Sequence, residues 1–227
     1  MRIFFDIDDT LFPTTEFAEL ARRNATRAMI EMGLEYGREE LYQKLVGIIQ
    51  KRGSNYEEHF NELCKELKIK RNSRYVAAAI AAYHNTKSTI SPYPEVPKLL
   101  LELKEQGHKI YIATNGNAIK QWDKLVRLGI SIFFDDVFVS EEMKVGKSKR
   151  FFELVMKELG AKKEECIMIG DREDADIIPA KEAGIKSIKI IRKEGKYCRE
   201  AEKTSADFKI SNLKETIKCL KSVGLDI

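Results

Sequence analysis

The sequence predicts an α/β protein: a doubly wound, parallel (Rossmann-like) sheet with an inserted all-helical domain. Short apolar segments typical of strands alternate with helical patterns after residue 91, whereas residues 14–91 show helical periodicity alone. Strands that alternate with helices form parallel βαβ units with right-handed crossovers. We therefore expect a core domain made of residues 1–13 and 92–227, interrupted by a helical domain at residues 14–91.

The core domain contains six strand patterns and four helical patterns. The first strand, MRIFFDI, is apolar enough to be buried on both faces, as central parallel strands are. A glycine follows each of the four helices, where a left-handed residue commonly ends a helix. Strands are expected at residues 1–7, 109–114, 136–140, 166–171, 186–191 and 207–210, and helices at 96–106, 118–128, 148–159 and 175–183.

The inserted segment carries four apolar stripes with helical spacing. They run over residues 17–32, 41–49, 56–67 and 76–83. Ser54 and Glu57 have the spacing of a capping box, which predicts that the third helix begins there. The prolines at 92, 94 and 97 mark the return to the core domain.

Composition excludes several classes of protein. The 40 basic and 36 acidic residues give a net charge of +4, which does not indicate a nucleic-acid partner. No apolar run approaches the roughly 20 residues that a membrane span needs. The first strand begins so early that no signal peptide is expected before it. We expect a cytoplasmic protein without a membrane partner, either a monomer or a homodimer.

Polar residues gather where the predicted strands end. In an open parallel sheet, ligands bind at the carboxyl ends of the strands. Carboxylates crowded at that edge repel one another unless a cation lies among them, and a hard divalent ion such as Mg²⁺ suits them. Hydroxyl, amide and ammonium groups suit a transferring phosphoryl group. The residues at these positions are Asp6, Asp8, Thr114, Asn115, Lys147, Asp171 and Asp176.

Two aspartates after the first strand fit covalent phosphoryl transfer. Asp6 is ionised at neutral pH and can attack phosphorus to form an aspartyl-phosphate. Asp8, two residues further on, can protonate the leaving oxygen if crowding by like charges raises its pKa. Asp9 is expected to point away from a metal or to cap the following segment.

Four segments, FFDIDDT, YIATNG, the lysine of GKSKRFF and IGDREDADIIPA, resemble in order the motifs of the haloacid dehalogenase-like (HAD) hydrolase superfamily. The resemblance covers essentially the whole chain, including a helical cap after the first motif. It implies that Asp6 is the nucleophile and Asp8 the acid/base. It also implies a metal site made of Asp6, the backbone carbonyl of Asp8, Asp171 and Asp176. The additional acid Asp174 leaves the ligand set open.

The resemblance assigns phosphoryl binding to Thr114 and Lys147. Lys144 and Lys149 are nearby competitors for the lysine role. Ser148 stands where the family usually has proline, and serine is a good residue to begin a helix.

These features imply an Mg²⁺-dependent phosphatase acting on a small phosphorylated substrate. The stretches AELARRNA, AYHNTK and NGNAIKQW are similar to archaeal members that act as small-molecule phosphatases, some on glyceraldehyde 3-phosphate; phosphoglycolate, other sugar phosphates and nucleoside monophosphates stay open. In the inserted domain, Arg22, Arg23 and Arg52 are candidates for contacting an anionic substrate or, alternatively, belong to solvated helix faces.

Three alternatives share part of this pattern. A 2-haloacid dehalogenase would have no use for a metal cluster or a leaving-group acid, which argues against it. A phosphomutase would share every core residue. A receiver-like phospho-accepting signalling domain also carries aspartates at strand ends, but it is roughly half as long and has no helical insert.

Overall fold

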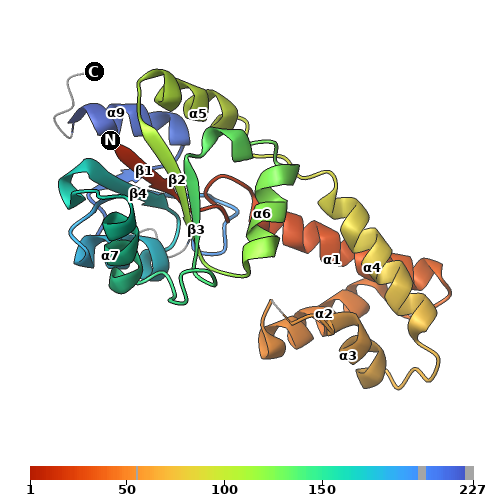
Figure 1. The fold of residues 1–227 in the computed structure, drawn as a ribbon. Helices are drawn as coiled ribbons and strands as arrows, with labels where there is room; N and C mark the ends of the chain where they lie inside the picture. The colour runs from red at the N-terminus through yellow and green to blue at the C-terminus, as the bar shows by residue number, and fades with distance from the viewer. Residues whose placement is uncertain (55, 199–202, 223–227) are drawn as a thin grey trace. The chain divides into compact units, whose positions relative to one another are not determined.

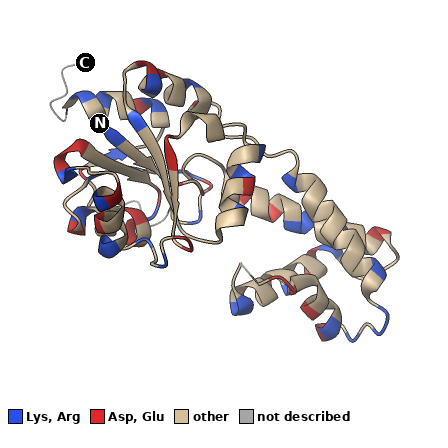
Figure 2. Ribbon diagram, in the orientation of Figure 1, with Lys and Arg blue, Asp and Glu red and all other residues tan. Residues whose placement is uncertain are grey.

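The computed structural model describes residues 1–54, 56–198 and 203–222 (Figure 1). The chain divides into two compact units. One, the core unit, comprises residues 1–15 and the chain from residue 91 onward; the other, the helical unit, comprises residues 16–90. Figure 2 shows basic and acidic residues interspersed along the helices of each unit.

The core unit is built on a six-stranded parallel sheet, which confirms the predicted α/β fold. The strand order is β3-β2-β1-β4-β5-β6, so β1 lies between β2 and β4. Each predicted strand is present. Their bounds are β1 Arg2–Phe5, β2 Lys109–Thr114, β3 Asp136–Val139, β4 Cys166–Gly170, β5 Lys186–Ile190 and β6 Phe208–Ile210.

The register of the central strands brings the reactive residues to one edge. Phe5 at the end of β1 pairs with Ile112 of β2 and Ile169 of β4. The residues that follow these three positions therefore emerge at the same end of the sheet. The amide of Asp6 donates to the carbonyl of Ile169 at 3.0 Å, which holds the first residue after β1 against β4.

Helices cover both faces of the sheet. Their bounds are α5 Val96–Glu105, α6 Ala118–Arg127, α7 Lys149–Glu158, α8 Ile178–Glu182 and α9 Thr216–Ser222. Phe4 and Met168 on one face pack with Phe151 and Phe152 of α7 in a buried cluster. Figure 1 shows α5 and α9 on the opposite side of the sheet from α7.

The helix expected at residues 175–183 is shorter than predicted and begins with a wider turn. Residues Glu173–Ile177 form a π-helical turn, and α8 starts only at Ile178. The amide of Ile177 reaches back five residues to the carbonyl of Arg172 at 3.2 Å. Such bulges are frequent at functional sites.

The helical unit contains the four expected helices around its own core, apart from the first two residues of α1, which belong to the core unit. They are α1 Thr14–Glu31, α2 Arg38–Arg52, α3 His59–Glu66 and α4 Ser73–Lys87. Met29, Leu45, Leu63 and Ala79 are fully buried there. Among the described residues, no helix is both long and apolar enough to span a membrane.

The predicted capping box is wrong. α3 begins at His59, with Glu58 in the N-cap position and no side-chain cap hydrogen bond. α2 runs to Arg52 and ends at Gly53, whose φ is +84°, so Ser54 still belongs to the link out of α2. The side chain of His59, at the start of α3, contacts the end of α2: its Nε2 lies 2.9 Å from the carbonyl oxygen of Gly53.

Candidate active site

Three buried carboxylates meet at the carboxyl ends of β1 and β4. Asp6 follows β1, Asp171 follows β4, and Asp176 lies on the π-helical turn. One carboxylate oxygen from each lies within 4.8 Å of the others, and none of the three residues is more than 6% exposed. The structure thus brings together three of the four residues that the sequence assigned to a metal.

A glycine makes room for the third carboxylate. A Cβ atom on Gly170 would lie 2.3 Å from Oδ2 of Asp176, too close for any side chain. That oxygen accepts a hydrogen bond from the amide of Arg172 at 2.9 Å. The wide turn and the glycine together allow Asp176 to fold back against the end of β4.

Lys147 lies among these carboxylates. Its Nζ is 2.5 Å from Oδ1 of Asp6 and 2.5 Å from Oδ1 of Asp176, and the side chain is 2% exposed. It also donates to the carbonyl of Ala113 at 3.0 Å. The competing lysines lie elsewhere: Lys144 is exposed in a turn, and Lys149 faces Glu153 on the surface of α7.

The cluster holds more negative charge than one lysine offsets. Burial, with smaller contributions from Asp176 and Asp8, raises the pKa of Asp6 to about 7 despite Lys147, so without a metal Asp6 is not fully ionised at neutral pH, contrary to the expectation from its reference pKa. Burial and the charges of Asp6 and Asp176 raise the pKa of Asp171 to about 9. Burial lowers the pKa of Lys147, but Asp176 and Asp6 outweigh it, so the net shift is upward.

The residues present fit a hard divalent cation. Within the described chain, Oδ1 of Asp171 is buried and accepts no hydrogen bond. A buried carboxylate oxygen without a donor is costly unless a cation satisfies it. Ions such as Mg²⁺ bind through one or a few carboxylates together with water and phosphate oxygens.

The two residues expected to bind a phosphoryl group at the end of β2 are Thr114 and Asn115. Thr114, the last residue of β2, is 1% exposed. Asn115 follows it, and its Oδ1 accepts a hydrogen bond from the amide of Lys147 at 2.8 Å. The side-chain oxygen of Asn115 therefore holds the loop that carries Lys147. The side-chain amide nitrogen of Asn115 is the atom that suits a phosphoryl oxygen.

Asp8 reaches the same edge, but its carboxylate does not join the acidic cluster. Lys124 of α6 lies 2.5 Å from Oδ1 and 2.8 Å from Oδ2 of Asp8. The hydroxyl of Thr14 donates to Oδ1 at 2.6 Å. Sequence motifs gave no role to Lys124. The available signal was its place on α6, between the buried Gln121 and Leu125.

The remaining acidic residues have structural partners. Asp9 accepts hydrogen bonds from the amide and hydroxyl of Thr15 at 2.9 and 2.5 Å, which confirms that it caps the following helix. Asp174 pairs with Arg172 at 2.5 Å and is 64% exposed, outside the cluster. Ser148 takes the N-cap position of α7 with an extended backbone but makes no side-chain cap hydrogen bond.

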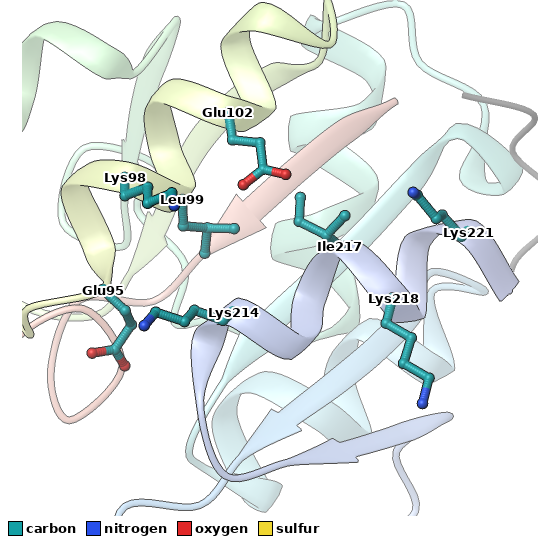
Figure 3. Close-up of a pocket in the computed structure, with 8 residues that line it drawn as sticks. All are labelled: Glu95, Lys98, Leu99, Glu102, Lys214, Ile217, Lys218 and Lys221. Atoms are coloured by element: carbon teal, nitrogen blue, oxygen red, sulfur yellow. The ribbon is translucent and has the colours of Figure 1, made fainter.

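A cavity of about 510 Å³ lies elsewhere in the core unit, between α5 and α9. Figure 3 shows Leu99 and Ile217 between the two helices, with Lys214 pointing toward Glu95. None of the carboxylates described above lines it. Its lining residues are Glu95, Lys98, Leu99, Glu102, Lys214, Ile217, Lys218 and Lys221.

Comparisons with known proteins show which family this chain belongs to. The model of the haloacid dehalogenase-like hydrolase family matches residues 1–184. The chain belongs to this family. It is 43% identical to a glyceraldehyde 3-phosphate phosphatase of Methanocaldococcus jannaschii, over 99% of this chain and 98% of that protein. It is 40% identical to a protein of the same name from Pyrococcus furiosus, over 96% of this chain and 92% of that one.

Solved structures share the fold of this chain. A putative β-phosphoglucomutase from Thermotoga maritima superposes with a TM-score of 0.72 at 24% identity, covering 98% of this chain and 99% of that one. The chain is therefore a HAD-type phosphatase, an enzyme, which excludes the receiver-like signalling alternative.

Proposed function

We propose that this enzyme is an Mg²⁺-dependent phosphatase that hydrolyses a small phosphomonoester through an aspartyl-phosphate on Asp6. The observation that carries the proposal is the buried group in which Lys147 contacts Asp6 and Asp176 at 2.5 Å beside Asp171. Glyceraldehyde 3-phosphate is the first candidate substrate, because it appears in the names of relatives that match nearly the whole chain.

The first step transfers the phosphoryl group to Asp6. Lys147 contacts Oδ1 of Asp6, so Oδ2 is the oxygen that attacks phosphorus while the bond to the leaving oxygen breaks. The hydroxyl of Thr114, the amide nitrogen of Asn115 and the ammonium of Lys147 hold the phosphoryl oxygens. Mg²⁺ held by Asp6, the backbone carbonyl of Asp8, Asp171 and Asp176 would supply further positive charge for those oxygens.

Asp8 handles the proton in both steps. In its acid form it protonates the leaving oxygen, so the product departs as an alcohol. As a carboxylate it then takes a proton from the water that attacks the aspartyl-phosphate. The bond between Asp6 and phosphorus breaks, inorganic phosphate leaves, and both aspartates return to their starting states.

We also propose that the helical unit acts as a cap that selects the substrate. Lids that close over a site exclude water and can fix which leaving group is accepted. The family resemblance supports this role, as does a core of the unit's own that lets it move as one body.

The decisive experiment measures phosphate release across a panel of phosphorylated metabolites. The panel contains glyceraldehyde 3-phosphate, phosphoglycolate, other sugar phosphates and nucleoside monophosphates, each with Mg²⁺ and then with EDTA. We expect turnover only with Mg²⁺, and an acid-stable phosphoprotein in wild type but not in Asp6→Asn. Asp174→Asn is the matched control and should stay active. Turnover in EDTA, or in Asp6→Asn, would contradict the mechanism.

A further inference from the structure

A lysine far away in the sequence holds the carboxylate of Asp8. Lys124 lies 116 positions after Asp8, on α6, and its Nζ contacts both oxygens of that carboxylate, at 2.5 and 2.8 Å. A third contact of the same nitrogen goes to Oε1 of Gln121 at 3.3 Å. A lysine ammonium has three N–H donors, so these contacts account for all of them.

The helix that carries Lys124 is tied to the phosphoryl-binding loop. Gln121 is 6% exposed, and its Nε2 donates to the carbonyl of Asn115 at 3.1 Å. A Cβ atom on Gly116 would lie 2.7 Å from that nitrogen, so Gly116 leaves room for the contact. Lys124 therefore extends from a buried network linked to the loop after β2.

The two lysines at this edge serve different aspartates. Lys147 contacts Asp6 and Asp176 in the buried cluster, while Lys124 contacts Asp8 outside it. The Asp8 side chain is 37% exposed and that of Lys124 is 18% exposed. An aspartate this exposed would sample several rotamers without a fixed partner.

We propose that Lys124 is a positioning residue that fixes the orientation of the Asp8 carboxylate for proton transfer to the leaving oxygen. The proposal rests on the proposed function, because it assumes the acid role of Asp8. A group that transfers a proton must lie within about 3 Å of the receiving atom. Lys124 and Thr14 together limit the carboxylate to one orientation, so it need not be ordered anew in each turnover.

This role predicts a dependence on the leaving group. An alkoxide leaves poorly without a proton, whereas p-nitrophenolate leaves as a stable anion. The parameter kcat/KM covers the steps up to formation of the aspartyl-phosphate, since that step releases the alcohol. Loss of the positioned acid should therefore lower kcat/KM for an alkyl phosphate and spare p-nitrophenyl phosphate.

The test compares Lys124→Met and Lys124→Arg with wild type on two esters. These are p-nitrophenyl phosphate and the alkyl phosphate of the panel with the highest turnover. Because general acid catalysis typically contributes about 10²–10⁴-fold, we expect Lys124→Met to raise the aryl-to-alkyl ratio of kcat/KM by roughly tenfold or more. Lys124→Arg, which keeps a donor pair for the carboxylate, should restore much of the ratio.

Arg127→Met is the matched control. It removes a positive charge from the same helix, where Arg127 pairs with Asp123 on the surface at 2.8 Å, and should leave the ratio at the wild-type value. Equal losses on both esters in Lys124→Met would show a merely structural role. An unchanged ratio, or a faster alkyl reaction, would also overturn the proposal.

Asp8→Asn separates the acid role of Asp8 from the positioning role of Lys124. If Asp8→Asn raises the ratio and Lys124→Met does not, the inference about Lys124 fails while the proposed mechanism stands. If Asp8→Asn leaves the ratio unchanged, the acid role of Asp8 itself fails.

Discussion

At the scale of single residues, Asp171 shows what the acidic cluster costs the protein without a cation. Its pKa is raised from its usual 3.8 to about 9, by burial first and then by Asp6 and Asp176. Between about pH 4 and pH 9, the Asp171 carboxyl keeps its proton in the folded protein but loses it in the unfolded chain. Stability of the metal-free protein therefore falls as pH rises from about 4 toward 9.

Asp171→Asn should reveal this cost in thermal unfolding. In EDTA we expect the Tm of the variant to exceed that of wild type by a margin that grows between about pH 4 and 9, because the amide has no proton to lose. Added Mg²⁺ should raise the Tm of wild type and not that of the variant, since a ligand stabilises only the fold that binds it.

Asp174→Asn is the control for that measurement, because Asp174 is exposed and pairs with Arg172. It should respond to Mg²⁺ as wild type does. A Tm difference between Asp171→Asn and wild type that is independent of pH would contradict the raised pKa of Asp171. Equal stabilisation of both proteins by Mg²⁺ would remove Asp171 from the metal site.

At the scale of elements, the strands were predictable and the turn after β4 was not. β1, β2 and β4 are short apolar runs followed by polar residues, and their shared direction places Asp6, Thr114 and Asp171 at one edge. The π-helical turn at Glu173–Ile177 has no periodic signature, because it arises where Asp176 folds back to the end of β4. The sequence therefore located the acidic residues without showing how they meet.

The partners of these residues were harder to predict than the residues themselves. Lys147 follows a strand end, so its place in the chain indicated its place in space. Lys124 reaches Asp8 from the second turn of α6, and such contacts depend on rotamer and helix position, which spacing does not specify. Asn115 was assigned to phosphate, yet its Oδ1 holds the amide of Lys147.

Gly170→Ala should disrupt the end of β4. The added methyl group would lie 2.3 Å from Oδ2 of Asp176, so the turn must shift and carry Asp176 away from Lys147. Changes behind metal ligands typically cost about 10–100-fold in affinity or activity, and we expect a loss of that size in Mg²⁺-dependent phosphate release.

Gly47→Ala is the matched control, at a position where a methyl group meets no other atoms. Gly47 lies inside α2, where a Cβ atom meets nothing within 4 Å. It should leave activity unchanged and stabilise the helix by about 0.5–1 kcal/mol, visible as a higher Tm. Full activity in Gly170→Ala would show that the position of Asp176 does not matter for the reaction.

At the scale of the whole molecule, a helical unit that acts as a cap has to supply the side chains that select the substrate. Two of its three candidate arginines for contacting the substrate already form ion pairs with glutamates. Arg23 pairs with Glu19 and Glu39, at 2.8 and 2.9 Å, and Arg52 pairs with Glu62 at 2.9 Å.

Arg22 differs from both. Within the described part of the chain, its guanidinium has no ion pair, although the side chain is half-buried on α1. It lies close enough to His59 and Tyr83 for its charge to act on both. Tyr83 in turn packs edge-on against Phe17 and Phe60. An arginine whose guanidinium has no carboxylate partner among the described residues is a candidate for binding an anionic or carbonyl group of a substrate.

Arg22→Ala should therefore weaken substrate binding more than catalysis. For glyceraldehyde 3-phosphate we expect KM to rise about tenfold, the effect of about 1.4 kcal/mol, which is close to the lower end of the range for a hydrogen bond to a charged group. The change in kcat should be smaller. For p-nitrophenyl phosphate, which has no aldehyde or hydroxyl group, KM should stay near the wild-type value. Arg23→Ala, which breaks surface ion pairs and removes the guanidinium from over the Tyr42 ring, should alter neither substrate's KM by more than about twofold. If Arg22→Ala behaved like Arg23→Ala, substrate selection would have to lie with other residues.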